Sequence, residues 1–344
     1  MPRRRLSQRQ IERVQRIQER RRRRLEERTQ LALDRLDEER LDDDMLGAPR
    51  PGRVVVRYGA NLAVEDEHGQ LYHCLCRQHV GQPVCGDRVV WQPTGEGNGV
   101  VTALQPRETL LSRPGYSGRD RPLAANISLL VAVVAPRPEP SSYLIDQYLV
   151  AARLIGVPVL VLCNKMDLCE TARDRHRFLS NLTHYRAIGY PLIAVSAKQT
   201  GTLDALIDQL TAETAILLGQ SGVGKSSLIK ALLPDREVQI GRLSKATGLG
   251  RHTTSAATCY RLSGGGSLID SPGVRSFRLG PISRRDLERG FREIEPFIAR
   301  CRFANCRHEQ EPDCAVRKAV AAGEIDPRRL ANFQHLAAQL EGND

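Results

Sequence analysis

The segment that most restricts what this chain can fold into is a glycine-rich turn at residues 219–226, with the sequence GQSGVGKS. An apolar run typical of a strand (215–219) precedes it, and a run with helical character (226–233) follows it. A G-x-x-x-x-G-K-[ST] turn between a strand and a helix predicts a loop that binds nucleotide phosphates. The glycines let successive backbone N–H groups face the phosphates at a helix N-terminus.

Two side chains of this loop have predicted chemical roles. Lys225 is expected to place its ammonium beside the β- and γ-phosphates and so to serve catalysis, and Ser226 is expected to give an oxygen to Mg²⁺. The predicted nucleotide contacts of the loop are Gly219, Gln220, Ser221, Gly222, Val223, Gly224, Lys225, Ser226 and Ser227.

Apolar runs alternate with helical patterns around this turn. The expected strands are residues 127–135, 157–163, 191–196, 215–219, 259–262 and 267–270, and the expected helices are 142–155, 173–185, 203–210 and 226–233. Continuous apolar strands that alternate with helices predict an α/β fold with a parallel sheet covered on both faces. Ligands bind at the carboxyl ends of the strands in such sheets, and the motifs below lie at those ends.

The residues after the expected strand 157–163 fit the guanine-reading motif N-K-x-D. Asp167 is expected to accept hydrogen bonds from the guanine N1–H and exocyclic amine, which adenine lacks. Asn164 is expected to tie this loop to the phosphate loop, and the Lys165 stem to pack over the base. A capped turn is the alternative for a lone four-residue match.

A second short motif follows the next expected strand. It consists of Ser196, Ala197 and Lys198, and the Ala197 N–H is expected to donate to guanine O6. Two matches at consecutive strand ends make coincidence implausible, so the sequence predicts a site selective for GTP and GDP.

Residues 270–273 close the last expected strand and fit D-x-x-G. Asp270 is expected to hold a Mg²⁺-bound water, and the Gly273 N–H to contact the γ-phosphate. The polar, Gly-rich segment 247–255 is typical of a mobile switch loop. Thr253 or Thr254 is the expected second Mg²⁺ ligand from the protein, with Thr254 preferred.

The position that orients the attacking water in Ras-like GTPases, after the D-x-x-G motif, is occupied by Val274. A valine cannot orient water, so the helper must come from elsewhere. His252 in the switch loop is the predicted catalytic residue, and the alternative is an exposed histidine without a role.

The motifs occur in an unusual order. In Ras-like proteins the phosphate loop and D-x-x-G precede N-K-x-D, whereas here N-K-x-D and S-A-K come first. The same sheet forms if the helix after S-A-K joins directly to the phosphate-loop strand, and residues 203–214 have the length for that connection. The sequence therefore predicts a circularly permuted P-loop domain.

The segment before this domain favours a small barrel. Five short strands are expected at residues 53–58, 62–66, 71–77, 87–92 and 99–104, which is typical of an OB-fold. Only Tyr58, Tyr72 and Trp91 are available there to stack on bases. An Arg-rich arm precedes the barrel, and a Pro/Gly/Arg-rich connector (113–122) follows it. The arm is interpreted equally well as a solvated helix or as a nucleic-acid-binding segment.

The segment after the D-x-x-G motif contains Cys301, Cys306, His308 and Cys314 in the spacing C-x₄-C-x-H-x₅-C. Three thiolates and an imidazole favour a closed tetrahedral Zn²⁺ site that leaves no position for a catalytic water. Reduced buried cysteines are the alternative. Residues 327–341 are expected to form a final helix. Nearby arginines suit contacts with a phosphate backbone: Arg284, Arg285, Arg289, Arg292, Arg300, Arg302 and Arg307.

Charge and cysteine usage indicate the partner and the compartment. The formal net charge of +11 favours a polyanionic partner, either nucleic acid or an acidic membrane surface. No apolar run approaches the roughly 20 residues of a membrane-spanning helix. Nine cysteines, four of them within apolar runs, indicate reduced thiols and a cytoplasmic location.

Together, these residues resemble the ribosome small-subunit-dependent GTPase A family of bacteria over roughly residues 50–340. The resemblance implies an N-terminal OB-fold barrel, a permuted GTPase domain, a zinc-binding α-helical C-terminal domain, and a catalytic histidine that falls on His252. The expected domains are an arm (1–48), the barrel (50–113), the GTPase domain (120–280) and the zinc domain (281–344).

The family further implies GTP hydrolysis stimulated by the 30S ribosomal subunit during its late maturation, with the barrel and the zinc domain contacting 16S rRNA. We expect a monomer without a membrane partner. The main alternative is a GTP-sensing RNA-binding protein with little hydrolysis, and a GTPase at a membrane surface is a third possibility that depends on the N-terminal arm alone.

Overall fold

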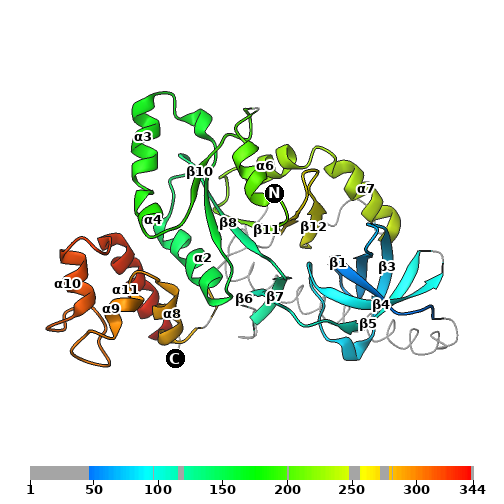
Figure 1. The fold of residues 1–344 in the computed structure, drawn as a ribbon, viewed down its shortest axis with the longest axis horizontal. Coiled ribbons are helices and arrows are strands. Elements are labelled where there is room, and N and C mark those ends of the chain that lie inside the picture. Colours follow the sequence, from blue (N-terminus) through cyan, green and yellow to red (C-terminus); the bar gives the residue numbers. More distant parts are fainter. Residues whose placement is uncertain are drawn as a thin grey trace, which may run out of the picture.

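The computed structural model describes residues 46–95, 97–114, 120–199, 201–247, 256–271, 279–280 and 282–341. In these residues the chain forms three parts: a barrel at one end, a helix-covered sheet in the middle and a group of helices at the other end (Figure 1). The Arg-rich residues 1–45, the predicted switch residues His252, Thr253 and Thr254, and Gly273 with Val274 lie outside the described residues.

The N-terminal barrel has five strands, as the sequence predicted. They are β1 (Arg50–Tyr58), β2 (Asn61–Glu65), β3 (Leu71–Cys76), β4 (Arg88–Gly95) and β5 (Asn98–Leu104), with a 3₁₀ turn at Gln78–Val80. Strand β1 pairs with both β2 and β4, and β3 pairs in parallel with β5. The barrel therefore closes in the order β1-β2-β3-β5-β4, which gives the expected OB-like architecture.

Trp91 lies in the centre of this barrel. Its side chain is fully buried among valines and leucines, and the indole Nε1 donates to the Pro51 carbonyl at 3.3 Å. A Cβ at Gly52 would lie 2.8 Å from the indole, so a glycine is needed where the strand passes the ring. The prediction that Trp91 is available to stack on bases is wrong, because the barrel core needs this large ring. Tyr72 packs against it with ring centroids 4.3 Å apart.

Both described ends of the connector after the barrel belong to strands, and residues 115–119 lie outside the described residues. Strands β6 (Leu110–Pro114) and β7 (Asp120–Ala125) pair antiparallel and include residues 113–114 and 120–122 of the expected connector, where no strand was predicted. Leu111 and Ala124 of these strands are buried in the core that also contains Val55 and Val56 of the barrel. Packing against the barrel therefore stabilises both strands that flank the connector.

The central sheet contains the nucleotide motifs. Its strands are β8 (Leu129–Val134), β9 (Val159–Cys163), β10 (Leu192–Ala194), β11 (Thr214–Leu218), β12 (Thr258–Arg261) and β13 (Ser267–Asp270). Its helices are α2 (Ser142–Leu154), α3 (Ala172–Ser180), α4 (Thr183–Ala187), α5 (Asp204–Leu210), α6 (Lys225–Leu232) and α7 (Arg236–Thr247), with a 3₁₀ turn at Met166–Leu168. The strand order is β10-β9-β8-β11-β13-β12.

Both faces of this sheet are covered, as predicted. Along β8, Leu130, Ala132 and Val134 face a core shared with α2, α3 and α4, whereas Leu129, Val131 and Val133 face a core shared with α5 and α6. All neighbouring strands are parallel except β12, which runs antiparallel to β13. The expectation of a purely parallel sheet is therefore wrong at this edge, where a short turn joins the two strands.

The permuted connection has the predicted form. Helix α5 ends at Leu210, and β11 begins at Thr214, the first residue of the strand that leads into the phosphate loop. The Glu213 N–H donates to the Leu210 carbonyl at 3.1 Å, and the Glu213 carbonyl accepts from the Ser267 N–H at 2.7 Å. These bonds fasten the short connection to the sheet.

Two helix predictions need correction. The single helix expected at residues 173–185 is two helices, because α3 stops at Ser180 and the Thr183 hydroxyl donates to the Ser180 carbonyl at 2.8 Å. Such a local bond competes with the helical pattern. Helix α7 was not predicted at all. It packs against β2 and β3 of the barrel, and this contact stabilises a segment with weak helical character.

The C-terminal part consists of α8 (Arg284–Gly290), α9 (Glu295–Ile298), α10 (Ala315–Ala321) and α11 (Pro327–Glu341), the last as predicted. Its core is built around Phe291 and Phe333, whose rings lie edge to face with centroids 5.3 Å apart. Val150 of α2 also belongs to this core, and a Cβ at Gly290 would lie 2.6 Å from the Val150 side chain. Gly290 therefore lets α8 approach the central domain closely.

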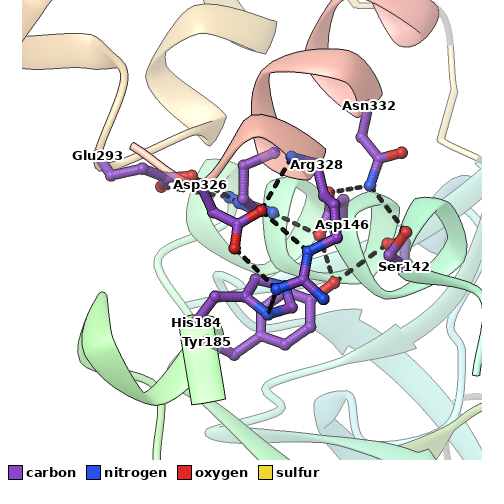
Figure 2. A network of polar contacts seen from close by, with 9 residues as sticks. Ser142, Asp146, His184, Tyr185, Glu293, Asp326, Arg328 and Asn332 are labelled. Carbon is purple, nitrogen blue, oxygen red and sulfur yellow. Dashed lines mark hydrogen bonds and ion pairs between the residues drawn. The ribbon is translucent and has the colours of Figure 1, made fainter. Parts of the chain in front are cut away.

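A buried polar network joins α11 to the central domain (Figure 2). Asp146 of α2 accepts hydrogen bonds from Tyr185 at 2.9 Å and Asn332 at 2.6 Å, and it pairs with Arg329 at 2.5 Å. Arg329 also pairs with Glu293 at 2.5 Å, and both Asp146 and Arg329 are almost fully buried. Burial raises the pKa of Asp146, and the Arg329 guanidinium opposes that shift.

A different network joins the barrel to the central sheet. Glu65 of β2 accepts from Arg53 at 2.9 Å and from Arg261 of β12 at 2.8 Å, and Arg53 also donates to the Ser267 hydroxyl at 2.9 Å. Strand β1 pairs with β12 at Val56 and Thr258, so barrel and sheet form one continuous eleven-stranded sheet within the described residues.

Candidate nucleotide site and metal centre

The phosphate loop lies between the end of β11 at Leu218 and the start of α6 at Lys225. Gly224 has a positive φ of 91°, and a Cβ there would lie 2.5 Å from the Asn164 amide nitrogen. A Cβ at Gly219 would lie 2.4 Å from the Val133 carbonyl oxygen of β8. Both glycines are therefore required by close approach of neighbouring groups, which is why the sequence has this composition here.

The side chains of the loop are arranged around its backbone. The Lys225 ammonium donates to the Gly219 carbonyl at 2.5 Å and to the Gln220 carbonyl at 2.8 Å, so it lies over the loop. Val223 is buried and anchors the loop, whereas Ser226 and Ser227 are exposed in the first turn of α6. Exposed N–H groups and hydroxyls at a helix N-terminus form a surface suited to an anion.

Asn164 connects three loops. It is fully buried, its amide donates to the Val223 carbonyl at 2.9 Å, and its amide oxygen accepts from the Ala197 N–H at 3.2 Å. One side chain thus joins the N-K-x-D loop, the phosphate loop and the S-A-K loop. The Ala197 N–H that we expected to contact guanine O6 makes this bond, so guanine would have to share or replace it.

The carboxylate of Asp167 is oriented by its neighbours. Oδ1 accepts from the Ser196 hydroxyl at 2.6 Å, and Lys198 Nζ lies 3.9 Å from Oδ2. Lys165 has a left-handed backbone with φ of 59°, and its ammonium donates to the Gly222 carbonyl of the phosphate loop. The residues of the two predicted guanine motifs therefore lie together beside the phosphate loop.

Asp270 ends β13 next to the phosphate-loop strand. Strand β13 pairs in parallel with β11, with Ile269 opposite Ile216. The carboxyl ends of both strands therefore lie at the same edge of the central sheet. The Asp270 carboxylate accepts from Arg236 of α7 at 2.8 Å. We did not predict Arg236, because no motif includes it and the partners are distant in sequence.

The structure therefore brings the phosphate loop, N-K-x-D, S-A-K and Asp270 to one edge of the sheet. The remaining predicted residues, His252, Thr254 and Gly273, lie outside the described residues, and their roles stay predictions.

A cluster of ligand atoms lies in the C-terminal part. Cys301, Cys306, His308 and Cys314 each offer one atom, and these atoms lie within 4.8 Å of one another. Cys301 Sγ lies 3.6 Å from His308 Nδ1 and 4.0 Å from Cys314 Sγ. The predicted set is thus gathered in space and could hold a metal ion.

The surroundings of the cluster hold its ligands in place. The His308 carbonyl accepts from Gln334 of α11 at 2.5 Å, and the Cys306 carbonyl accepts from Arg284 of α8 at 3.3 Å. The Glu311 carboxylate accepts three backbone N–H groups of the loop between the ligands, at 2.6–3.1 Å. These bonds lower the pKa of Glu311 to about 2.

Several arginines that we expected to face a phosphate backbone contact the protein itself. Arg284 pairs with Glu288 at 3.3 Å, Arg302 pairs with Asp313 at 3.5 Å, and Arg292 lies over the Tyr190 ring. Arg289 and Arg302 are still more than half exposed, at 64% and 63%. Only part of this charge is therefore committed to the fold. None of the described helices is both long and apolar enough to cross a bilayer.

Comparison with known proteins gives consistent matches. The RsgA GTPase family model matches residues 104–280. The chain is 42% identical over 344 residues to the small ribosomal subunit biogenesis GTPase RsgA of Pseudomonas aeruginosa (strain LESB58), with all of both chains covered. It is 47% identical over 310 residues to the protein of that name from Chromohalobacter salexigens, covering 88% of this chain and 90% of that one.

Two solved structures share the fold. The crystal structure of YjeQ from Thermotoga maritima superposes with a TM-score of 0.70 at 31% identity, covering 86% of this chain and 99% of that one. YloQ, described as a circularly permuted GTPase, gives 0.68 at 26% identity, covering 86% and 96%. The order of the motifs, their assembly at one sheet edge and these matches agree, and the chain belongs to the RsgA GTPase family.

Proposed function

We propose that this GTPase acts in biogenesis of the small ribosomal subunit, hydrolysing GTP when bound to the 30S particle and contacting 16S rRNA. The observation that carries the nucleotide part is the pair of hydrogen bonds through which Asn164 joins the phosphate loop to the S-A-K loop. The names of the relatives and the net charge of +11 support the ribosomal part, because a cationic protein suits a polyanionic partner. Action on cytoplasmic ribosomal particles follows from this proposal.

Guanine recognition is assigned to Asp167. Its carboxylate would accept from the guanine N1–H and amine, and the Ser196 hydroxyl at 2.6 Å holds it in a fixed orientation. The Lys165 stem, directed to the phosphate loop, would cover the base plane. Lys225, already beside the loop carbonyls, would exchange those contacts for the β- and γ-phosphates.

Magnesium would accompany the nucleotide. Mg²⁺ prefers hard oxygen ligands, and the exposed Ser226 hydroxyl at the start of α6 is one of them. The Asp270 carboxylate at the same sheet edge would hold a Mg²⁺-bound water. Thr254 is the proposed further ligand. Bound magnesium neutralises charge on the phosphates, while His252 is proposed to orient the attacking water.

Zinc is the proposed ion of the Cys₃His cluster. Bond lengths of about 2.3 Å to sulfur and 2.0–2.1 Å to nitrogen in a tetrahedron separate the ligand atoms by roughly 3.5–3.8 Å. The separations of 3.4 Å between His308 Nδ1 and Cys314 Sγ, and of 3.6 and 4.0 Å from Cys301, fit this size. Four protein ligands leave no open position, so the role would be structural.

The decisive experiment is single-turnover GTP hydrolysis with and without saturating purified 30S particles. We expect slow hydrolysis by the free protein and a rate increase of a few orders of magnitude with 30S, since each ~1.4 kcal/mol removed from the barrier is tenfold. Equal rates under both conditions, with GTP bound, would instead identify a GTP-sensing RNA-binding protein with little hydrolysis.

Two variants separate chemistry from binding. His252→Ala is expected to retain nucleotide affinity and pelleting with 30S but to lose most of the stimulated turnover. Lys225→Ala is the matched variant that damages nucleotide binding itself. Near-normal stimulated turnover in His252→Ala would rule out His252 as the catalytic group and make a group supplied by the ribosome the next candidate.

A further inference from the structure

Arg236 belongs to none of the nucleotide motifs, yet it contacts the carboxylate of Asp270. Its Nη2 lies 2.8 Å from Asp270 Oδ2, and each side chain is 26% exposed. The guanidinium also lies over the Tyr260 ring of β12, 5.3 Å from its centroid. The carboxylate that we assign to magnesium therefore already has a cationic partner from the protein itself.

The helix that begins at Arg236 is attached at two further points. One turn along α7, the Gln239 amide donates to the Arg261 carbonyl at 3.0 Å and accepts from the Arg261 N–H at 3.2 Å. Beyond it, Leu243 is buried, and α7 packs against β2 and β3 of the barrel. Helix α7 thus links the Asp270 carboxylate to the edge strand and to the barrel, and its last residue, Thr247, begins the predicted switch loop.

We propose that Arg236 is a positioning residue that holds the Asp270 carboxylate until magnesium arrives and then releases it, so that metal occupancy is transmitted to helix α7. This inference rests on the proposed magnesium site. Two cations at one carboxylate repel each other, and magnesium favours the state in which the guanidinium has left. A ligand shifts an equilibrium only when it binds one state better, and this repulsion supplies the difference.

The test is a magnesium titration of nucleotide binding, with fluorescent GDP as the probe. Arg236→Gln removes the competing charge and is expected to lower the half-saturating Mg²⁺ concentration about threefold. A change of this size is what the modest strength of a partly exposed ion pair predicts. Arg242→Gln is the matched control, because Arg242 is an exposed arginine on the same helix. Arg236→Lys retains the charge and is expected to restore most of the wild-type value.

Hydrogen–deuterium exchange of the full chain gives a readout independent of activity. In the wild type, Mg²⁺ added with GDP is expected to increase exchange in the first turn of α7, and in Arg236→Gln this exchange is high without Mg²⁺. An unchanged half-saturating Mg²⁺ concentration in Arg236→Gln, or equal effects of Arg236→Gln and Arg242→Gln, would overturn the inference about Arg236. The proposed magnesium site would be unaffected by either result. The variant Asp270→Asn tests the magnesium site itself. If its half-saturating Mg²⁺ concentration is no higher than that of the wild type, the proposed magnesium site is wrong and the inference about Arg236 is wrong with it.

Discussion

The central domain has two junctions, and their polar parts are built differently. At the C-terminal junction the central charged group is hidden from solvent, with side-chain exposures of 0% for Asp146, 1% for Arg329 and 7% for Glu293, while the Arg153–Glu295 pair at its edge is 44% and 40% exposed. At the barrel junction, Glu65 is 9% exposed, but its partners Arg53 and Arg261 are 27% and 53% exposed. Both junctions also contain apolar packing, so the difference lies in the charges.

The central ion pairs of the two junctions therefore differ in the expected free-energy cost of breaking them. Removing one member of a buried ion pair leaves a charge without compensation, whereas a partly exposed pair exchanges easily with water. Breaking the ion pairs between α2 and the C-terminal helices is therefore expected to cost more than breaking those at the barrel junction. Strand pairing between β1 and β12 and a shared apolar core still hold the barrel to the sheet.

The largest expected effect is loss of the metal from the C-terminal part. Purified protein should contain about one zinc per chain, and Cys306→Ala should lose it and loosen helices α8–α11, because metal-binding free energy is also folding free energy. Metal analysis and proteolysis check this result, with Cys76→Ala in the barrel as the control. Folded, 30S-stimulated wild-type protein free of zinc would contradict it.

The next effect tests the buried junction directly. Arg329→Met removes the cation between Asp146 and Glu293, and we expect a loss of about 3–5 kcal/mol in the free energy of unfolding. Chemical denaturation measures this loss. The exposed Arg317 of α10 provides a control, since Arg317→Met should change stability by less than about 0.5 kcal/mol. Similar effects of the two substitutions would remove the distinction between the junctions.

The same junction should make stability depend on pH. Burial, and then the charge of Arg328, lowers the pKa of His184 to about 4, so the folded protein keeps this imidazole neutral while the unfolded chain takes up a proton near pH 6.5. Stability should therefore fall as pH decreases from about 6.5 to 4, by up to about 3 kcal/mol. His184→Gln should remove this part of the slope, whereas His68→Gln, at an exposed barrel position, should not.

The smallest effect is expected at the barrel junction. Arg261→Gln breaks a partly exposed ion pair with Glu65 and should cost less than about 1 kcal/mol, with a smaller loss at high salt because screening already weakens the pair. Denaturation at low and high ionic strength checks this. A loss comparable with that of Arg329→Met would show that the ion pairs of the two junctions contribute equally to stability.

The features that sequence reasoning recovered are those encoded locally. The strand–turn–helix at the phosphate loop, the barrel strands and α11 follow from short patterns of glycine, charge and hydrophobicity. The guanine-binding roles of the N-K-x-D and S-A-K residues stay predictions. The features it missed depend on partners far apart in the chain: Asp146 meets Arg329, Asp270 meets Arg236, and α7 is stabilised by the barrel. The prediction for Trp91 was wrong because an aromatic residue in a small barrel can pack in the core or lie on a binding face, and the sequence pattern does not distinguish the two.

The most direct test of the account is the base preference of Asp167→Asn. Competition titrations with GTP, ATP and xanthosine triphosphate should show that the wild type prefers GTP, because the Asp167 carboxylate accepts from N1–H and the amine. Xanthine has a carbonyl in place of that amine, so the asparagine variant should lose GTP affinity and gain affinity for xanthosine triphosphate. Unchanged preference for GTP in the variant would remove Asp167 from the site and contradict the assignment of this sheet edge to guanine.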